Sequence, residues 1–270
     1  TDELVANPIV NTSPVSDVYE FAMRDLEFAA KYLPEVSSAA GRVNKYSAFG
    51  MLSRVYLTYA GYSSNPNSAT RNQDYLDLAK KAALKVIENR NFELMTDYAD
   101  LFMIDKNNNS ETLFALQWVS NGTYGECNTI QDYFACESAT GNDRAWGGYV
   151  FAQPDVIWEY EKGDKRRQPT WMAYGDHYPE IQKANGGYTC EKKASGTVSG
   201  IYCKKYVCGS SKDNAKITSG STPINTYMLR LAEVYLIYAE AILGNNPSTE
   251  SAQACRFGTP KFDYLRRYSS

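Results

Sequence analysis

The sequence predicts a mainly α-helical fold in which helices hold an irregular, loop-rich region. Four segments, residues 14–33, 42–60, 74–89 and 226–243, repeat apolar residues at spacings of three and four, the period of an amphipathic helix. Between residues 92 and 225 these periodic runs vanish, and Gly, Asn, Ser and Thr become frequent. An irregular region of this length exceeds what a connection requires, and such regions are usually functional.

The first predicted helix has recognisable start and stop signals. Ser13 is a candidate N-cap, Pro14 fits the first helical position, and Pro34 ends the segment. Its apolar stripe consists of Val18, Ala22, Leu26, Ala29 and Leu33. These signals together predict one amphipathic helix of about five turns.

The other three helices combine alanine with large aromatic residues on their apolar faces. The second is expected to end at Gly61 as a left-handed cap, and the fourth at Gly244. Small residues let helix axes approach closely while aromatic rings of a neighbour fill the remaining space. The chain has 22 tyrosines, which suit both helix packing and wet binding surfaces.

The region between residues 92 and 225 contains only short predicted elements. Residues 155–161 are consistent with a short helix, with Trp158 on its buried face. Residues 200–208 alternate enough to predict a strand that pairs with residues 187–192 as a hairpin. Trp118 and Trp171 are expected to pack in the interior.

Composition excludes several classes of function. A net charge of −3 gives no basic surface for nucleic acid. The single histidine, His177, argues against a histidine-based catalytic triad and excludes a multi-histidine metal site. The six cysteines include no CxxC pair, and the sequence leaves open whether they are free thiols or bridge as Cys127–Cys136 or among Cys190, Cys203 and Cys208.

Five stretches have a pattern more specific than helical periodicity. They read SDVYEFAMRDLEFAAKYLP (16–34), GRVNKYSAFGMLSRVYLTYAG (41–61), AKKAALKVIENRNFELMTDYADLF (79–102), NNSETLFALQW (108–118) and YMLRLAEVYLIYAEA (227–241). In this order they resemble the SusD/RagB family, the last almost letter for letter. The resemblance covers the middle of a family member, and residues 248–270 do not follow its pattern.

The resemblance implies a single SusD-like domain over residues 1–270. Tetratricopeptide-like helix pairs (residues 14–91 and 226–244) would form the scaffold, and residues 92–225 a ligand-binding subdomain with short strands. It implies non-catalytic capture of a polysaccharide or oligosaccharide, without a cofactor, at the surface of a Bacteroidetes-like bacterium. Delivery to a SusC-like TonB-dependent transporter is implied as well. The resemblance also implies that the protein is an outer-membrane lipoprotein. Its lipid anchor would precede Thr1 and would be its only link to the membrane.

Sugar recognition requires flat aromatic faces and side chains that hydrogen-bond hydroxyls, and residues 124–151 are the richest source of both. Trp146 is the leading candidate, because Asp143 and Arg144 place polar groups beside a stacking platform. The candidate ligand-binding residues are Trp146, Tyr149, Tyr124, Tyr133, Asn128, Asp143 and Arg144.

The same residues also admit other classes of function. An α-solenoid that binds protein or peptide is the main alternative, and tyrosines on the helices rather than the loops would favour it. A glycosidase would need two carboxylates across a cleft; Asp143 or Glu159 with Glu161 are nominees among 31 acidic residues. Residues 105–116 begin like a calcium loop but have Leu116 where a bidentate glutamate is required.

Overall fold

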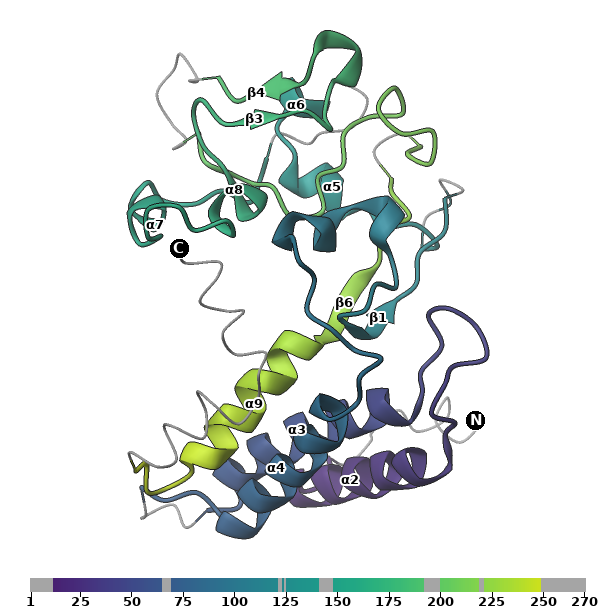
Figure 1. The fold of residues 1–270 in the computed structure, drawn as a ribbon, viewed down its shortest axis with the longest axis vertical. Coiled ribbons are helices and arrows are strands. Elements are labelled where there is room, and N and C mark those ends of the chain that lie inside the picture. The colour runs from purple at the N-terminus through teal and green to yellow at the C-terminus, as the bar shows by residue number, and fades with distance from the viewer. Residues whose placement is uncertain are drawn as a thin grey trace. The chain divides into compact units, whose positions relative to one another are not determined.

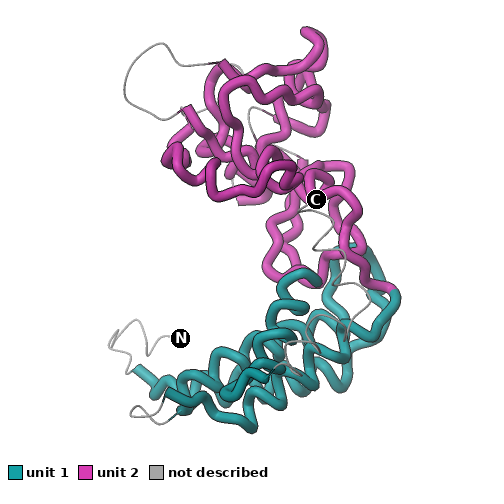
Figure 2. Tube along the Cα trace, turned by 60° about the vertical axis from the view of Figure 1, so that its left-hand side comes forward, with its two compact units in different colours: residues 1–90, 231–258 teal, residues 91–230, 259–270 magenta. Residues whose placement is uncertain are grey.

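The computed structural model describes residues 12–64, 69–120, 123, 125–140, 148–191, 200–218 and 221–248. The chain forms two compact units, shown in different colours in Figure 2. Unit 1 comprises the described part of residues 1–90 and 231–258, and unit 2 that of residues 91–230. Within these described ranges, no helix is long and apolar enough to cross a membrane.

Unit 1 is a bundle of the helices that the periodicity predicts. They are α2 (Val15–Tyr32), α3 (Lys45–Tyr62), α4 (Gln73–Ile87) and α9 (Leu231–Leu243). Helix α3 packs against the other three, and α9 also packs against α4 (Figure 1). A segment from the far end of the sequence therefore completes a bundle that begins near residue 15.

The bundle core confirms the expected combination of alanine and aromatic residues. Ala79 and Ala82 of α4 are buried beside Tyr56 and Tyr59 of α3. The ring of Tyr59 meets that of Tyr75 edge to face, with centroids 4.7 Å apart. Small side chains on one helix therefore make room for rings on the next.

The helix ends differ from the predicted ones in two places. Pro14, not Ser13, is the N-cap of α2, and no side chain caps this end. Helix α3 continues through Gly61 to Tyr62, so Gly61 is not its cap. Instead, the Ser63 hydroxyl donates to the Tyr59 carbonyl in the last turn at 2.7 Å. This side-chain bond helps to cap the end of the helix.

Two ion pairs, made by Glu233 and Glu240, join α9 to the rest of unit 1. Arg54 of α3 donates to Glu233 through Nε and Nη2, at 2.6 and 2.7 Å. Arg71, just before α4, donates to Glu240 at 2.5 Å. These contacts fix the rotation of α9 on the bundle.

The first five residues of the fourth predicted helix form a strand of unit 2 instead. Thr226–Arg230 forms strand β6, antiparallel to β1 (Thr112–Leu116), and α9 starts only at Leu231. Arg230 also donates to Glu111 at 2.5 Å, and the Glu111 side chain is almost completely buried. Pairing with a strand more than 100 residues away thus outweighs the local helical pattern.

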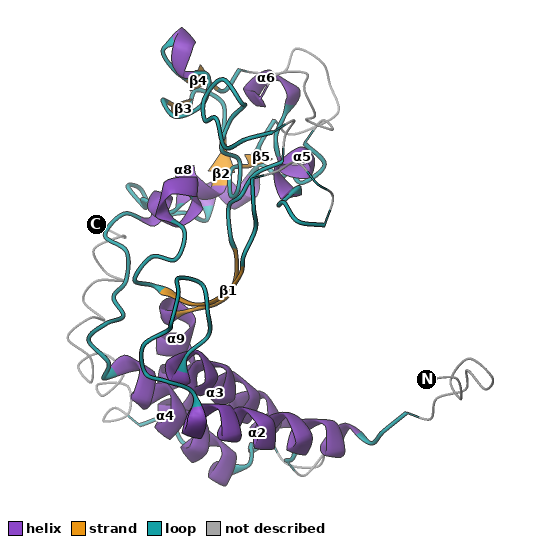
Figure 3. Cartoon of the chain, turned by 90° about the vertical axis from the view of Figure 1, so that its right-hand side faces the viewer, coloured by secondary structure: helices purple, strands orange, loops and turns teal. Residues whose placement is uncertain are grey.

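The remaining elements of unit 2 are short, as Figure 3 shows. The helical ones are η1 (Tyr98–Phe102), η2 (Ile104–Lys106), α5 (Ile130–Phe134), α6 (Glu137–Thr140), α7 (Asp155–Trp158), α8 (Arg167–Thr170) and η3 (Lys183–Asn185). Helix α7 confirms the predicted short helix. Trp158, however, is 79% exposed, so its predicted burial was wrong.

The predicted hairpin between residues 187–192 and 200–208 does not form. Strand β4 (Tyr188–Thr189) pairs with β3 (His177–Tyr178), and β5 (Tyr202–Cys203) pairs with β2 (Trp171–Met172). Gly186 and Gly187, both at positive φ, turn the chain back onto β3. Among the described cysteines, all five thiols are free, and four of them are buried.

Candidate functional site

The structure brings together two of the predicted binding residues, Tyr133 and Tyr149. Tyr133 lies on α5 and is 44% exposed; Tyr149 lies in the following loop and is 67% exposed. The Tyr149 N–H donates to the Tyr133 carbonyl at 2.8 Å, so the two backbones are in direct contact. One backbone hydrogen bond thereby joins the segments that carry two exposed tyrosines.

Gly148 explains how Tyr149 reaches this position. Its φ is +65°, and a Cβ at this position would lie 2.5 Å from the buried Tyr202 ring of β5. On the other side of Tyr149, Ala152 donates to Ile201 at 2.9 Å. The loop is therefore anchored to the β5 segment on both sides of the exposed tyrosine.

Phe151 belongs to the same surface and was not singled out from the sequence. Its backbone bridges to Tyr202, and its ring is exposed. We call Tyr133, Tyr149 and Phe151 the aromatic surface. A sequence signal existed, since Tyr149 and Phe151 are spaced as alternate residues of an extended segment, which places them on one side.

Asn128 has a structural task rather than an exposed one. It is almost completely buried; its amide donates to the Ile224 carbonyl at 2.9 Å and its oxygen accepts from the Ile130 N–H at 2.9 Å. The second bond holds the start of α5, the helix of Tyr133. This burial does not fit a direct ligand contact, so that prediction is corrected.

The other four predicted binding residues, Tyr124, Asp143, Arg144 and Trp146, lie outside the described residues. The remaining tryptophans are described. Trp118 is half-buried and donates through Nε1 to the Thr226 hydroxyl at 3.0 Å, and Trp171 is half-buried in β2. Both fit the packing role predicted for them.

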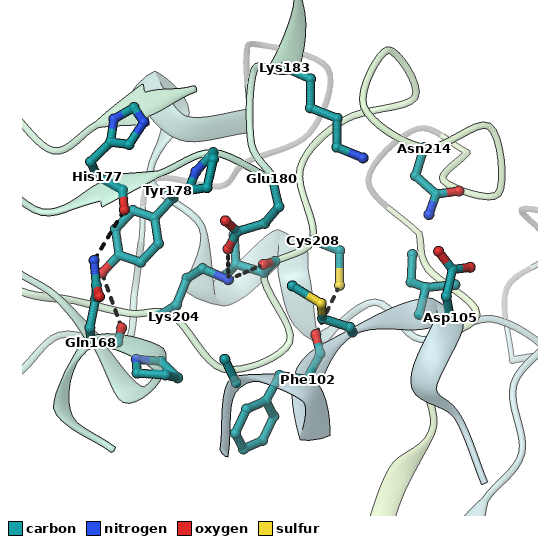
Figure 4. A pocket seen from close by; sticks show the side chains of 16 residues that line it. Phe102, Asp105, Gln168, His177, Tyr178, Glu180, Lys183, Lys204, Cys208 and Asn214 are labelled. Atoms are coloured by element: carbon teal, nitrogen blue, oxygen red, sulfur yellow. Dashed lines mark hydrogen bonds and ion pairs between the residues drawn. The ribbon is translucent and has the colours of Figure 1, made fainter. Parts of the chain in front are cut away.

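Unit 2 also contains a cavity of about 250 Å³, shown in Figure 4. It lies where two apolar clusters meet, because its wall includes Phe102 from one cluster and Tyr178 from the other. Its charged wall is formed by Lys204, which is only 7% exposed and donates to Glu180 at 3.0 Å. The Lys204 ammonium also donates to the Val207 carbonyl at 2.9 Å.

The cavity does not contain an evident nucleophile. Burial raises the pKa of the Cys208 thiol to about 12, so this thiol stays protonated at neutral pH. The His177 ring is hydrogen-bonded through Nδ1 to the Thr189 hydroxyl at 3.0 Å, away from Cys208 (Figure 4). In the part of the chain that the structure describes, no group of three or more His, Cys, Asp or Glu could hold a metal ion.

Comparisons with known proteins agree with this picture. The SusD family model matches residues 90–256, more than half of the chain. The chain belongs to the SusD family. A SusD-like protein of Bacteroides ovatus is 39% identical over 259 residues, and SusD-like protein P2 of Formosa agariphila is 26% identical over 268 residues. These SusD-family matches cover 94% and 92% of this chain but 45% and 46% of the relatives, so it spans about half their length.

Solved structures of the SusD type share the fold. One that was crystallised with xylogluco-oligosaccharide is 36% identical, has a TM-score of 0.83, and is covered to 52% by the whole of this chain. A SusD superfamily protein of Parabacteroides distasonis is 23% identical with a TM-score of 0.64, over 92% of this chain and 51% of its own length. The mainly α-helical class predicted from the sequence is therefore confirmed.

Proposed function

We propose that this chain binds a glycan through the aromatic surface of unit 2, together with Trp146, which precedes Gly148 by two residues in the sequence. The observation behind the proposal is the backbone hydrogen bond that joins two exposed tyrosines, Tyr133 and Tyr149. The apolar face of a pyranose ring packs on such rings, while its hydroxyls remain hydrogen-bonded to water or to polar side chains. Asp143 and Arg144, three and two residues before Trp146, are the proposed hydrogen-bonding groups.

The proposed ligand class is a xyloglucan-type oligosaccharide. A structure 36% identical to this chain, with a TM-score of 0.83, contains such a ligand. Its likeness extends over the whole of this chain, which includes the aromatic surface. We extend the ligand class of that relative to this chain as the first one to test.

The proposal further assigns capture without cleavage. In the cavity, the Cys208 thiol is protonated, and the His177 ring is hydrogen-bonded to Thr189. In the proposed cycle, the protein is a lipoprotein of the outer-membrane surface, and it passes the glycan to a SusC-like TonB-dependent transporter. The family resemblance supports this assignment of location and partner.

One observation favours the alternative of a protein-binding module. Helix α2 exposes large apolar side chains at helical spacing, namely Val18, Phe21, Phe28 and Tyr32. Exposed apolar patches on soluble proteins commonly mark interaction surfaces. A glycan-binding surface in unit 2 and a protein-binding face on α2 are compatible, because the residues differ.

The test is isothermal titration calorimetry with xyloglucan oligosaccharides, combined with an assay for released reducing ends. Each of Tyr149→Ala and Trp146→Ala is expected to weaken binding roughly 3- to 10-fold, which corresponds to about 0.5–1.5 kcal/mol per lost aromatic contact. No reducing ends are expected to be released.

Tyr174→Ala is the matched control, since Tyr174 is 71% exposed but lies outside the aromatic surface. The proposal fails if the wild type does not bind any tested glycan. It also fails if Tyr174→Ala weakens binding as much as Tyr149→Ala does.

A further inference from the structure

The wall of the unit 2 cavity contains a buried lysine in an ion pair, which is unusual for a protein interior. Lys204 is 7% exposed, pairs with Glu180 at 3.0 Å, and lies 5.4 Å from the centre of the Tyr178 ring. Taking an ammonium group out of water costs more than an ion pair usually returns. Charged groups held on a concave wall are, in contrast, what ligand sites use for orientation.

The two segments that carry this pair are both strained. Gln182, two residues after Glu180, has φ +56°, and Tyr206, two residues after Lys204, has φ +64°. They are two of three such non-glycine residues in the described chain. Left-handed backbone at non-glycine positions is uncommon and concentrates where a ligand clamp requires it. Gln182 is held by donating to the Ser138 carbonyl at 2.6 Å.

The opposite wall is formed by the loop of residues 210–214, which is hydrogen-bonded to the segment that carries Glu180. The Asp213 carboxylate accepts from the backbone N–H of Lys183 at 2.8 Å and from that of Ser210 at 2.8 Å. Asn214 follows and lines the cavity; its Oδ1 accepts from the Lys216 N–H at 3.0 Å. Its Nδ2 has no acceptor among the described residues, which leaves a donor for a ligand.

The charges around the cavity cancel. The lining side chains include two carboxylates, Asp105 and Glu180, and two ammonium groups, Lys183 and Lys204. The lining histidine, His177, is exposed and hydrogen-bonded to Thr189. A balanced set of donors and acceptors suits a neutral molecule with several hydroxyls rather than an anion.

The size of the cavity matches a single sugar ring. A volume of about 250 Å³ equals the space of about eight water molecules at roughly 30 Å³ each. Sites for drug-sized ligands are larger, at roughly 300–1,000 Å³. Phe102 and Tyr178 supply apolar wall for the C–H face of a sugar, and the polar side chains meet its hydroxyls.

We propose that this cavity binds a single neutral sugar residue, as a site separate from the aromatic surface. None of the three residues of the aromatic surface lines it. The choice of a sugar rests on the proposed glycan-binding function; the single-ring size and the neutrality follow from the cavity itself. In this arrangement, the aromatic surface contacts an extended chain, and the cavity takes one terminal or free sugar.

The test uses ligand-observed NMR with the methyl glycosides of glucose, galactose and xylose, and with glucuronate as the charged probe. We expect millimolar binding of at least one neutral glycoside and none of glucuronate. Asn214→Leu, which removes the amide at nearly constant size, is expected to weaken binding at least tenfold. The matched control Asn185→Leu changes an exposed asparagine of η3 outside the cavity and is expected to leave binding unchanged.

The outcomes separate this site from the aromatic surface. Tyr149→Ala should weaken oligosaccharide binding and leave methyl glycoside binding intact. The cavity proposal is overturned if no neutral glycoside binds to the wild type, if glucuronate binds better, or if Asn185→Leu is as harmful as Asn214→Leu. If Asn214→Leu does not fold, a wild-type crystal soaked with the bound glycoside decides, since sugar density between Asn214 and Glu180 supports the proposal and an empty cavity refutes it.

Discussion

Unit 1 is held together by apolar side chains at helical spacing, whereas unit 2 combines two apolar clusters with side-chain amides bonded to distant polar groups. In unit 1, fully buried Leu76 and Ala79 of α4 pack within the bundle. In unit 2, buried Gln131 donates to the Gly209 carbonyl at 2.8 Å and accepts from the Cys208 N–H at 2.6 Å. Asn225 likewise joins Asn107, Asn108, Gln117 and Trp118.

The difference shows how a protein can present irregular surfaces without losing order. Backbone groups in loops must be hydrogen-bonded when buried, and in a helix they satisfy one another. In unit 2, side chains such as Asn128 and Gln131 take over this task. Loops stabilised in this way expose aromatic rings and line a cavity with a charged pair.

The largest expected effect concerns the apolar core of unit 1. Leu76→Ala is expected to lower the free energy of unfolding by roughly 3 to 5 kcal/mol, because Leu76 is fully buried and leaves a cavity. Urea unfolding followed by circular dichroism at 222 nm measures this. Leu236→Ala is the matched control on an exposed leucine of α9, expected to cost less than about 0.5 kcal/mol. Equal costs for the two variants would break the comparison.

The next effect concerns the amide network of unit 2. Gln131→Met keeps the size but leaves the Gly209 carbonyl and the Cys208 N–H unpaired, which should cost about 2 kcal/mol or more. All four tryptophans lie between residues 91 and 230, so their fluorescence reports on unit 2 during urea unfolding. The exposed Gln153 gives the control Gln153→Met. A cost below about 0.5 kcal/mol for Gln131→Met would show that the network is dispensable.

The smallest effect concerns acid and the loop at Asp213. Burial opposes ionisation, but hydrogen bonds from the backbone N–H groups of Ser210 and Lys183 lower the pKa of Asp213 below its ordinary value. A lowered folded-state pKa means that this carboxylate stabilises the fold above the unfolded value of about 3.9, and that the gain disappears as the pH falls through the folded pKa.

Asp213→Asn should therefore melt slightly below the wild type at neutral pH, by no more than about 2 °C, with the gap closing below about pH 4. Fluorescence-monitored melting from pH 3 to 7 measures the gap. If the difference in melting temperature does not change with pH, the effect comes from the shape of the side chain and not from its charge.

Regular structure was predictable where the relevant interactions are local. The spacing of Ala22, Leu26 and their neighbours suffices to predict α2, since a helix forms its hydrogen bonds four residues apart. Val18, expected on the same apolar stripe, is exposed instead. Tyr133 and Tyr149 were named from composition alone. Their contact, and the place of Phe151 beside them, depend on Gly148 packing against Tyr202.

By itself, the sequence determined the helices, the alanine and aromatic faces that pack them, and the ordered motifs of the SusD family. The tertiary structure decided what depends on remote partners: Thr226–Arg230 is a strand because β1 lies beside it, and Asn128 is buried because Ile224 accepts its amide. It also decided that Lys204 meets Glu180 at a cavity wall. Periodicity records a neighbour four residues away, whereas a cavity or a sheet depends on segments that only folding brings together.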